Sequence, residues 1–337
     1  MKSANQKARH GTCVVSFDVA SSFQSFRTKG LRVLEKGDPI FARLRQNLLD
    51  VVVKAMPNIE ICPIDKDEFR SKIWEQVNRR VIGSNRHAVL VTCSEMAELN
   101  LNEGLSLSIN RLFDTDGNML GYGPRPGFEY LNRQFDELAR KIAGRPVVLA
   151  KEGAFRGHTC QLILKELAVR NVKVVSLIIG FCDVEAKASI EQEFNGEFGT
   201  IYTFDKLIEW VADRDLIPFM PGCGRVLGER SVHSFMPVRT ADGFSCSFPY
   251  VLPFGKMEKW ASLSSDDAHK ISAHFLDFAI ELFDRLDEEN GRQIMVDELL
   301  GDNPRVSIPV EIASEGRIPN LNRGIVGFLE QARKKLD

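Results

Sequence analysis

Short apolar runs alternate with amphipathic stretches along the first two thirds of the chain. The runs Thr12–Asp18, Ala88–Cys93 and Val147–Ala150 are rich in β-branched residues, which is typical of strands buried within a sheet. Apolar residues recur at helical spacing in Pro39–Met56, and Asp65–Arg80 has acidic residues in its first turn, so both stretches are predicted to be helices. The alternation of strands and helices predicts an α/β fold.

The same pattern continues beyond Val147. An apolar face over residues 162–169 predicts a helix that opens at Thr159, and Val172–Ile179 is a further apolar run. A strand–loop–helix–strand unit of this kind forms a right-handed crossover in a parallel sheet. Four shorter elements complete the predicted sheet: a strand at Ile59–Pro63, a helix at Glu185–Phe194, a strand at Thr200–Thr203 and a helix at Asp205–Arg214.

The segment from Leu105 to Gly127 has the pattern of a β-hairpin. Apolar residues alternate from Leu105 to Ile109, and Asp116 with the following glycine supplies a turn. A calcium loop that begins at Asp114 is a poorer interpretation, because its glycine would stand at the fourth position instead of the sixth.

The amino-acid composition of the sequence changes at residue 215. Proline, glycine and aromatic residues become frequent, which is typical of rigid surface loops, and a long amphipathic helix follows at Asp266–Glu289. A helix, a strand at Arg305–Ile312 and a basic terminal helix are predicted to end the chain. With 337 residues the chain is long for one domain. We therefore divide it into an N-terminal α/β part (1–86), a sheet core (87–214) and a C-terminal extension (215–337).

Composition and charge narrow the class of protein. The 44 basic and 46 acidic residues give a net charge of −2, so no overall field attracts nucleic acid or a membrane, although local basic patches leave nucleic acid open as a partner. No apolar stretch is long enough to span a membrane. The seven cysteines have no paired spacing, which predicts reduced thiols and a cytoplasmic protein: Cys13, Cys62, Cys93, Cys160, Cys182, Cys223 and Cys246.

The candidate chemistry lies at the junction between the strand at Val147–Ala150 and the helix that opens at Thr159. The connecting loop contains Gly153 and Gly157. A strand that turns through glycines into a helix forms an anion site, because free backbone N–H groups and the positive end of the helix dipole face the same point. The sequence therefore predicts a phosphate-bearing ligand.

Residues 147–159 resemble the phosphoribosyl pyrophosphate (PRPP) loop of type I phosphoribosyltransferases. In that family, four apolar residues precede two acidic residues, three variable residues and a Thr-Gly-x-Thr turn. Here Val147–Ala150 are the apolar four, Lys151 and Glu152 replace the acidic pair, and the turn is Arg156–Thr159. The second acidic residue, the turn glycine and the last threonine match, whereas Lys151 and Arg156 depart from the pattern.

The resemblance implies a twisted parallel sheet of the type I phosphoribosyltransferase kind with helices on both faces, and an irregular C-terminal hood. It implies that Glu152 is the catalytic residue, which holds the ribose hydroxyls, and that the turn wraps the 5′-phosphate. Arg156 could grip the phosphate through its forked guanidinium. The predicted ligand-binding residues are Lys151, Glu152, Gly153, Ala154, Phe155, Arg156, Gly157, His158 and Thr159.

The family also has a hairpin lid and a pyrophosphate-contacting loop. By position these correspond to the hairpin at 105–127 and to Ser94–Met96, and Arg111 and Arg125 are the nearest basic candidates for a pyrophosphate, unless both are solvated surface residues. In the family, Mg²⁺ bridges the pyrophosphate and the ribose. One carboxylate in place of two predicts a weaker magnesium site, with no direct metal ligand from the protein.

These features leave three functions open. We expect a ribose-phosphate or nucleotide sensor that binds PRPP, ribose 5-phosphate or a nucleotide. Such a protein would be a non-catalytic accessory or regulatory protein of the bacterial defence type, with residues 215–337 as the surface for a protein partner. The first alternative is an active glycosyltransferase that moves phosphoribose from PRPP to a nucleobase. The second is a nucleoside-processing hydrolase, which would need an acid pair near the sugar.

Overall fold

The computed structural model describes residues 11–84, 87–93, 105–232, 234–257, 263–309 and 322–337. The chain forms two compact units, each assembled from separate segments. Unit 1 comprises Met1–Val14, Asn58–Ile109 and Phe128–Trp210; unit 2 comprises Val15–Pro57, Asn110–Gly127 and Val211–Asp337. The three-part division by chain order stays a prediction.

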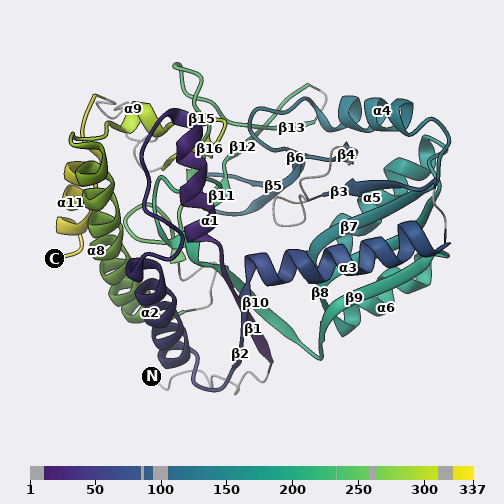
Figure 1. Cartoon of the computed structure of the whole chain (residues 1–337), viewed down its shortest axis with the longest axis horizontal. Coiled ribbons are helices and arrows are strands. Elements are labelled where there is room, and N and C mark those ends of the chain that lie inside the picture. Colours follow the sequence, from purple (N-terminus) through teal and green to yellow (C-terminus); the bar gives the residue numbers. More distant parts are fainter. Residues whose placement is uncertain (1–10, 85–86, 94–104, 233, 258–262, 310–321) are drawn as a thin grey trace. The chain divides into compact units, whose positions relative to one another are not determined.

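Unit 1 contains a five-stranded sheet with the order β4-β3-β7-β8-β9 (Figure 1). Every neighbouring pair in this sheet is parallel. The strands are β3 (Val89–Thr92), β4 (Leu105–Ser106), β7 (Val147–Ala154), β8 (Val174–Asp183) and β9 (Glu197–Phe204). The predicted α/β fold with a parallel sheet is confirmed.

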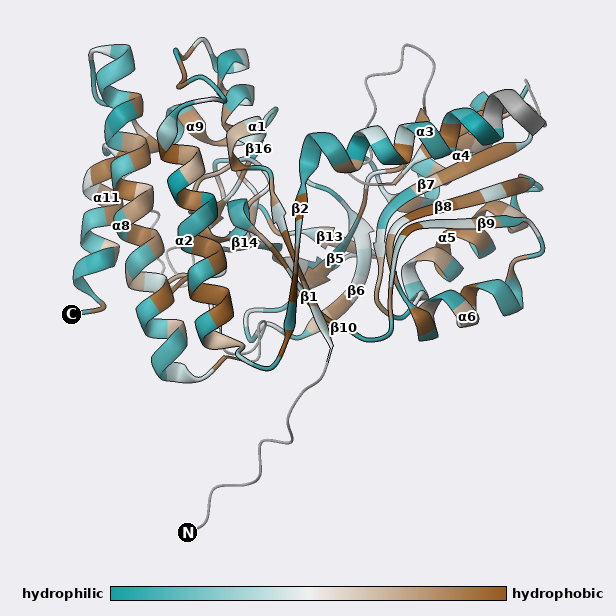
Figure 2. Cartoon of the chain, turned by 60° about the horizontal axis from the view of Figure 1, so that its bottom comes forward, coloured by the Kyte–Doolittle hydropathy of each residue, from teal (hydrophilic) through white to brown (hydrophobic). Residues whose placement is uncertain are grey.

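Helices cover both faces of this sheet, as predicted. Helix α3 (Lys66–Ser84) lies on one face, and α5 (His158–Val169) and α6 (Val184–Glu193) lie on the other (Figure 2). Helix α4 (Leu131–Ile142), which was not predicted, packs beside α5. Burial on both faces explains why β3, β7 and β8 are continuous apolar runs.

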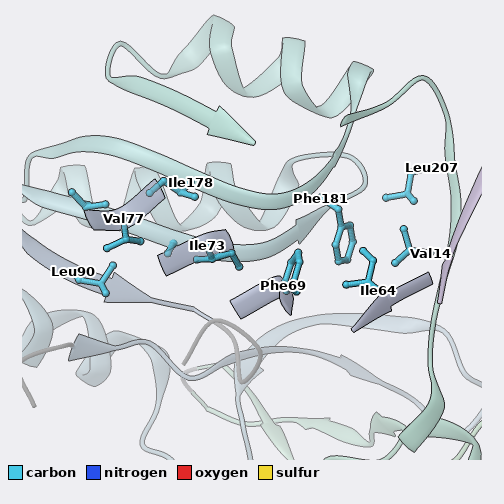
Figure 3. Close-up of a cluster of buried hydrophobic side chains, with 11 residues drawn as sticks. Val14, Ile64, Phe69, Ile73, Val77, Leu90, Ile178, Phe181 and Leu207 are labelled. Atoms are coloured by element: carbon cyan, nitrogen blue, oxygen red, sulfur yellow. The ribbon is translucent and has the colours of Figure 1, made fainter. Parts of the chain in front are cut away.

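Apolar residues that recur at helical spacing on α3 form the core between this helix and the sheet. Phe69, Ile73 and Val77 stand four positions apart and therefore share one side of α3. They pack against residues of the sheet (Figure 3): Leu90, Val148, Ala150, Ile178 and Phe181. Each large side chain buried in this way contributes about 1.5–3 kcal/mol. This cluster anchors β7, the strand that carries the candidate loop.

A second parallel sheet has the order β10-β1-β2. Its strands are β1 (Thr12–Phe17), β2 (Glu60–Asp65) and β10 (Leu207–Ala212). The helix predicted at Asp205–Arg214 is wrong, because this segment forms β10 and the short 3-10 helix η2 (Asp213–Leu216). Leu207 and Val211 of β10 are buried and stand four positions apart, as residues on one face of a helix do. In the structure, the backbone N–H and C=O groups of this segment instead form hydrogen bonds with β1.

Unit 2 contains the predicted long helices. Helix α8 (Ser265–Asn290) packs against α2 (Pro39–Ala55) and α11 (Ile325–Lys334). Short helices α1 (Val19–Gln24) and η1 (Ser25–Lys29) follow β1 directly. The apolar stripe of α8 is buried in this layer, as expected for a packing helix.

The predicted hairpin is present as β5 (Ile109–Phe113) and β6 (Met119–Pro124). Asp114 fixes its turn, because Oδ1 accepts backbone N–H bonds from Asp116 at 3.0 Å and from Asn118 at 2.8 Å. Leu105 is not part of the hairpin but belongs to β4 of the parallel sheet. Leu105 pairs with Val91 of β3, and this pairing places it in the parallel sheet instead of the hairpin.

The remaining strands of unit 2 are short. They are β11 (Arg225–Val226), β12 (Gly228–Arg230), β13 (Phe235–Pro237), β14 (Cys246–Phe248), β15 (Gly301–Asp302), β16 (Arg305–Val306) and β17 (Ile308–Pro309), and α9 is Val296–Leu299. The strand predicted at Arg305–Ile312 therefore forms two short pieces, and its residues from 310 onward lie outside the described part. Among the described residues, no helix has the length and apolar character required to cross a membrane.

Candidate functional site

The order of strands in the five-stranded sheet reverses between β3 and β7. Strand β4 lies on one side of β3, whereas β7, β8 and β9 follow one another on the other side. In open α/β sheets, ligands bind outside the carboxyl ends of the strands at such a switch point. The segment Phe155–Gly157, which follows β7, begins at this point. The predicted pyrophosphate loop at Ser94–Met96 follows β3 and lies outside the described residues.

The predicted strand, turn and helix are all present at the candidate loop. Strand β7 continues to Ala154, and three residues connect it to α5, which begins at His158. Gly157 caps the helix with φ +76°, a left-handed conformation that favours glycine. A Cβ atom at this position would also lie 3.1 Å from Cγ1 of Ile190. The first turn of α5 therefore offers backbone N–H groups and a positive dipole end to an anion.

Glu152 is the buried acidic group of the loop. Its residue surface is 7% exposed, and its carboxylate has no hydrogen bond or ion pair to any residue that the structure describes. A carboxylate that has no protein partner can accept hydrogen bonds from a donor that enters the loop. The hydroxyl groups of a ribose would supply donors of this kind.

Basic side chains accompany this carboxylate. Arg156 and His158 are exposed on either side of Gly157. The Nζ atom of Lys151 donates a hydrogen bond to the carbonyl oxygen of Gly153 at 2.9 Å. Burial raises the pKa of the Cys160 thiol, and the nearby charge of Lys151 partly opposes that effect.

The backbone of the loop is fixed by aromatic packing. A Cβ atom at Gly153 would lie 2.2 Å from Cε2 of Phe181, so only glycine fits this close approach. The ring of Phe155 meets that of Phe181 edge-on, with centroids 6.4 Å apart and an interplanar angle of 89°. Ala154, which stands between Gly153 and Phe155 in the sequence, is also buried. These contacts hold the strand end rigidly, which suits a preformed binding loop.

The other predicted site residues belong to unit 2. Arg111 is exposed on β5, and Arg125, directly after β6, is buried. Their proposed contact with a pyrophosphate stays a prediction, as do the individual roles of the loop residues.

The fit of a magnesium ion can be tested on the residues present. No group of three or more His, Cys, Asp or Glu residues within the described ranges could hold a metal. The loop provides one carboxylate, Glu152, with the ammonium-bearing Lys151 beside it in sequence. A magnesium ion there would need most of its oxygen ligands from the bound molecule and from water.

No protein-family model and no curated protein matches the sequence. Among solved structures, TT1426 from Thermus thermophilus is 14% identical, with an alignment that covers 40% of this chain and 83% of that protein at a TM-score of 0.28. A hypothetical protein from Neisseria gonorrhoeae with bound ppGpp is 15% identical, and the alignment covers 43% of this chain and 82% of that protein at a TM-score of 0.31. Similarity at this level carries no argument about function.

Proposed function

We propose that unit 1 binds a ribose 5-phosphate group, as the free sugar phosphate or as part of PRPP or a nucleotide, on the loop Lys151–Thr159. The phosphate would sit on the first turn of α5, and Glu152 would accept hydrogen bonds from the ribose hydroxyls. The observation that supports this proposal most directly is the carboxylate of Glu152, which has no hydrogen bond or ion pair to any described residue and stands on β7 at the switch point of the sheet.

The charges of the loop favour a binding protein over an enzyme. Lys151 and Arg156 supply positive charge where the resembling family uses an acidic residue and a hydroxyl. A ligand phosphate would be neutralised by these side chains without a metal ion. The proposed role is therefore a ribose-phosphate or nucleotide sensor of accessory or regulatory type.

The alternative is a working phosphoribosyltransferase. In that case Mg²⁺ would be held near Glu152, mostly by oxygen atoms of the ligand and by water, and would supply positive charge to the pyrophosphate that a nucleobase displaces. A nucleoside hydrolase is less favoured, because Glu152 is the one carboxylate among residues 147–159.

Calorimetric titration separates these functions. The ligands are ribose 5-phosphate, PRPP, common nucleoside monophosphates and ppGpp, each with and without Mg²⁺ and at low and high salt. A sensor is expected to bind without metal, and its affinity should fall steeply with salt. Release of pyrophosphate from PRPP in the presence of a nucleobase would show the transferase instead. Absence of binding for all ligands would overturn the proposal.

A further inference from the structure

Ser108 is a buried serine just beyond the carboxyl end of β4, in the sheet that carries the candidate loop. The residue is 1% exposed, and its Oγ atom has no hydrogen-bond partner among the residues that the structure describes. A hydroxyl enclosed in this way cannot bond to bulk water either, so leaving it unpaired is unfavourable for the fold. Such groups are uncommon in folded proteins, and each one calls for a physical explanation.

The backbone of Ser108 is fully bonded. Its N–H donates to Oε1 of Gln134 at 2.9 Å, and its carbonyl oxygen accepts a hydrogen bond from Nε2 of the same side chain at 3.2 Å. Gln134 is anchored in turn, because Nε2 also donates to the carbonyl oxygen of Glu129 at 2.7 Å. The N–H of Ile109 donates to the carbonyl oxygen of Leu107 at 3.1 Å, so the chain turns at Ser108. The position of Ser108 is therefore fixed, while its hydroxyl is left without a described partner.

The strand register places Ser108 in line with Glu152. Thr92 of β3 pairs with Ser106 of β4 on one side and with Ala150 of β7 on the other. Ser108 and Glu152 each stand two residues beyond this row, toward the carboxyl ends of their strands. Two strand spacings, or about 10 Å, therefore separate the two residues across the switch point of the sheet.

Two polar side chains thus flank the switch point, one from the β4 side and one from β7. The carboxylate of Glu152 has no hydrogen bond or ion pair to any described residue, and the hydroxyl of Ser108 has no described hydrogen-bond partner. The two observations are independent of each other. A polar ligand at the switch point would supply partners to both groups.

We propose that the hydroxyl of Ser108 donates a hydrogen bond to the group attached to C1 of the bound ribose phosphate. This contact rests on the ligand proposed for Lys151–Thr159. With the phosphate on the first turn of α5 and the ribose hydroxyls at Glu152, C1 lies at the end of the sugar ring opposite to the phosphate. The substituent on C1 is therefore the part of the ligand that can extend toward Ser108.

The length of this gap selects the class of ligand. A hydroxyl on C1 is too short to span about 10 Å, whereas a nucleobase or a pyrophosphate is long enough. Both of these groups carry hydrogen-bond acceptors. The ligand is therefore a ribose phosphate with an extended polar group on C1, and free ribose 5-phosphate leaves Ser108 unpaired. Because Ser108 is covered, binding has to displace the side chains that lie over its hydroxyl.

Calorimetric titration of the full chain tests this contact through Ser108→Ala. The ligands are ribose 5-phosphate, nucleoside monophosphates and PRPP. The variant should bind the nucleotide or PRPP at least about threefold more weakly than the unaltered protein, because one hydrogen bond is lost. Its affinity for ribose 5-phosphate should stay the same. A loss confined to nucleoside monophosphates identifies a base as the group on C1, and a loss confined to PRPP identifies pyrophosphate.

Denaturant unfolding gives a second readout that does not depend on a ligand. Ser108→Ala removes an unpaired hydroxyl, so its denaturant midpoint should equal or exceed that of the unaltered protein. Ser176→Ala is the matched control, at a buried serine of β8 whose Oγ accepts a hydrogen bond from Nη1 of Arg80 at 3.0 Å. The control should unfold at a lower denaturant concentration and keep every ligand affinity.

The outcomes that contradict the contact are distinct from those that contradict the proposed function. If Ser108→Ala binds nucleotides and PRPP as the unaltered protein does, the contact is excluded and the proposed function stands. An equal loss for ribose 5-phosphate would place the effect away from C1, and a lower denaturant midpoint would show that the hydroxyl is paired within the fold; either result overturns the contact. Absence of binding by the unaltered protein would overturn the proposed function and this contact with it.

Discussion

Nζ of Lys151 donates a hydrogen bond of 2.9 Å to the carbonyl oxygen of Gly153, two residues further along the candidate loop. The bond ties the lysine side chain to its own loop, and the charge of Lys151 opposes the effect of burial on the pKa of the Cys160 thiol. The type I phosphoribosyltransferases that the loop resembles have an acidic residue at this position. This exchange of sign is the physical reason to expect ligand binding without metal.

The first prediction exchanges the charge of the loop. Lys151→Asp combined with Arg156→Thr should make PRPP binding depend on Mg²⁺, because a second carboxylate replaces a fixed positive charge. Calorimetry with and without Mg²⁺ measures the effect. Lys165→Glu, an exposed charge reversal on α5, is the control and should leave the metal dependence as it is. Metal-independent binding by the double variant would show that the loop charge does not decide this property.

The second prediction concerns the buried carboxylate. Glu152→Gln should weaken binding of ribose 5-phosphate by on the order of 1–3 kcal/mol, because a charge-assisted acceptor for the ribose hydroxyls is lost. Glu185→Gln, at an exposed position of α6, is the matched control. If both variants bind as the unaltered protein does, and circular dichroism shows an intact fold, Glu152 does not contact the ligand.

The third prediction uses two glycines with nearly the same conformation. Gly157 has φ +76° and Gly144 has φ +78°, so an alanine at either position should lower stability by about 1–2 kcal/mol. A Cβ atom at Gly144 meets no other atom within 4 Å, whereas at Gly157 it would lie 3.1 Å from Cγ1 of Ile190 and 3.5 Å from the carbonyl oxygen of Ala186, both on α6. Gly157 also directly precedes the first turn of α5, where the phosphate is proposed to bind. Only Gly157→Ala should therefore also weaken ligand binding. Equal affinities for the two variants would remove Gly157 from the site.

The fold could be predicted where local pattern and tertiary structure agree. The apolar strand β7 and the glycine turn into α5 are local features, so both were found. Helix α4 was missed although its buried residues Leu131, Phe135, Leu138 and Ile142 have helical spacing. Strand β10 was mistaken for a helix, because its character depends on pairing with β1, which is distant in sequence.

The same distinction applies to the functional groups. Glu152 and Gly157 lie within one short segment, and a resemblance of thirteen residues was enough to select them as candidates. Oδ1 of Asp213 accepts the backbone N–H of Asp18 at 2.8 Å, and the two residues meet only because β1 and β10 are neighbours in a sheet. Nothing in the sequence near either residue indicates the other, so this pair required the structure.

The fourth prediction concerns the reactivity of Cys160. The residue is 1% exposed, and burial raises the pKa of its thiol. A thiol that is both inaccessible and protonated reacts slowly, even at the start of a helix. Labelling of the native protein with a thiol reagent should therefore modify Cys62, which is partly exposed, before Cys160. Fast labelling of Cys160 that phosphate slows would contradict this order and place the anion beside the thiol.

The last prediction concerns the stability of unit 2 as a function of pH. Burial raises the pKa of Asp215 to about 6, against the opposing effects of Arg214 and of the Gly224 N–H, which donates to Oδ1 at 2.8 Å. The folded state therefore keeps a proton that the unfolded state loses near pH 4. The unfolding free energy should fall by up to about 3 kcal/mol as the pH rises from about 4 to about 6, and no further contribution from Asp215 follows above that window.

Asp215→Asn isolates this contribution. The amide oxygen of asparagine can still accept the N–H of Gly224, but the side chain no longer titrates. Denaturant unfolding followed by circular dichroism should show that the variant lacks this decrease between about pH 4 and about pH 6, whatever its absolute stability. Identical pH profiles for the two proteins would mean that Asp215 ionises as readily in the folded chain as in the unfolded one.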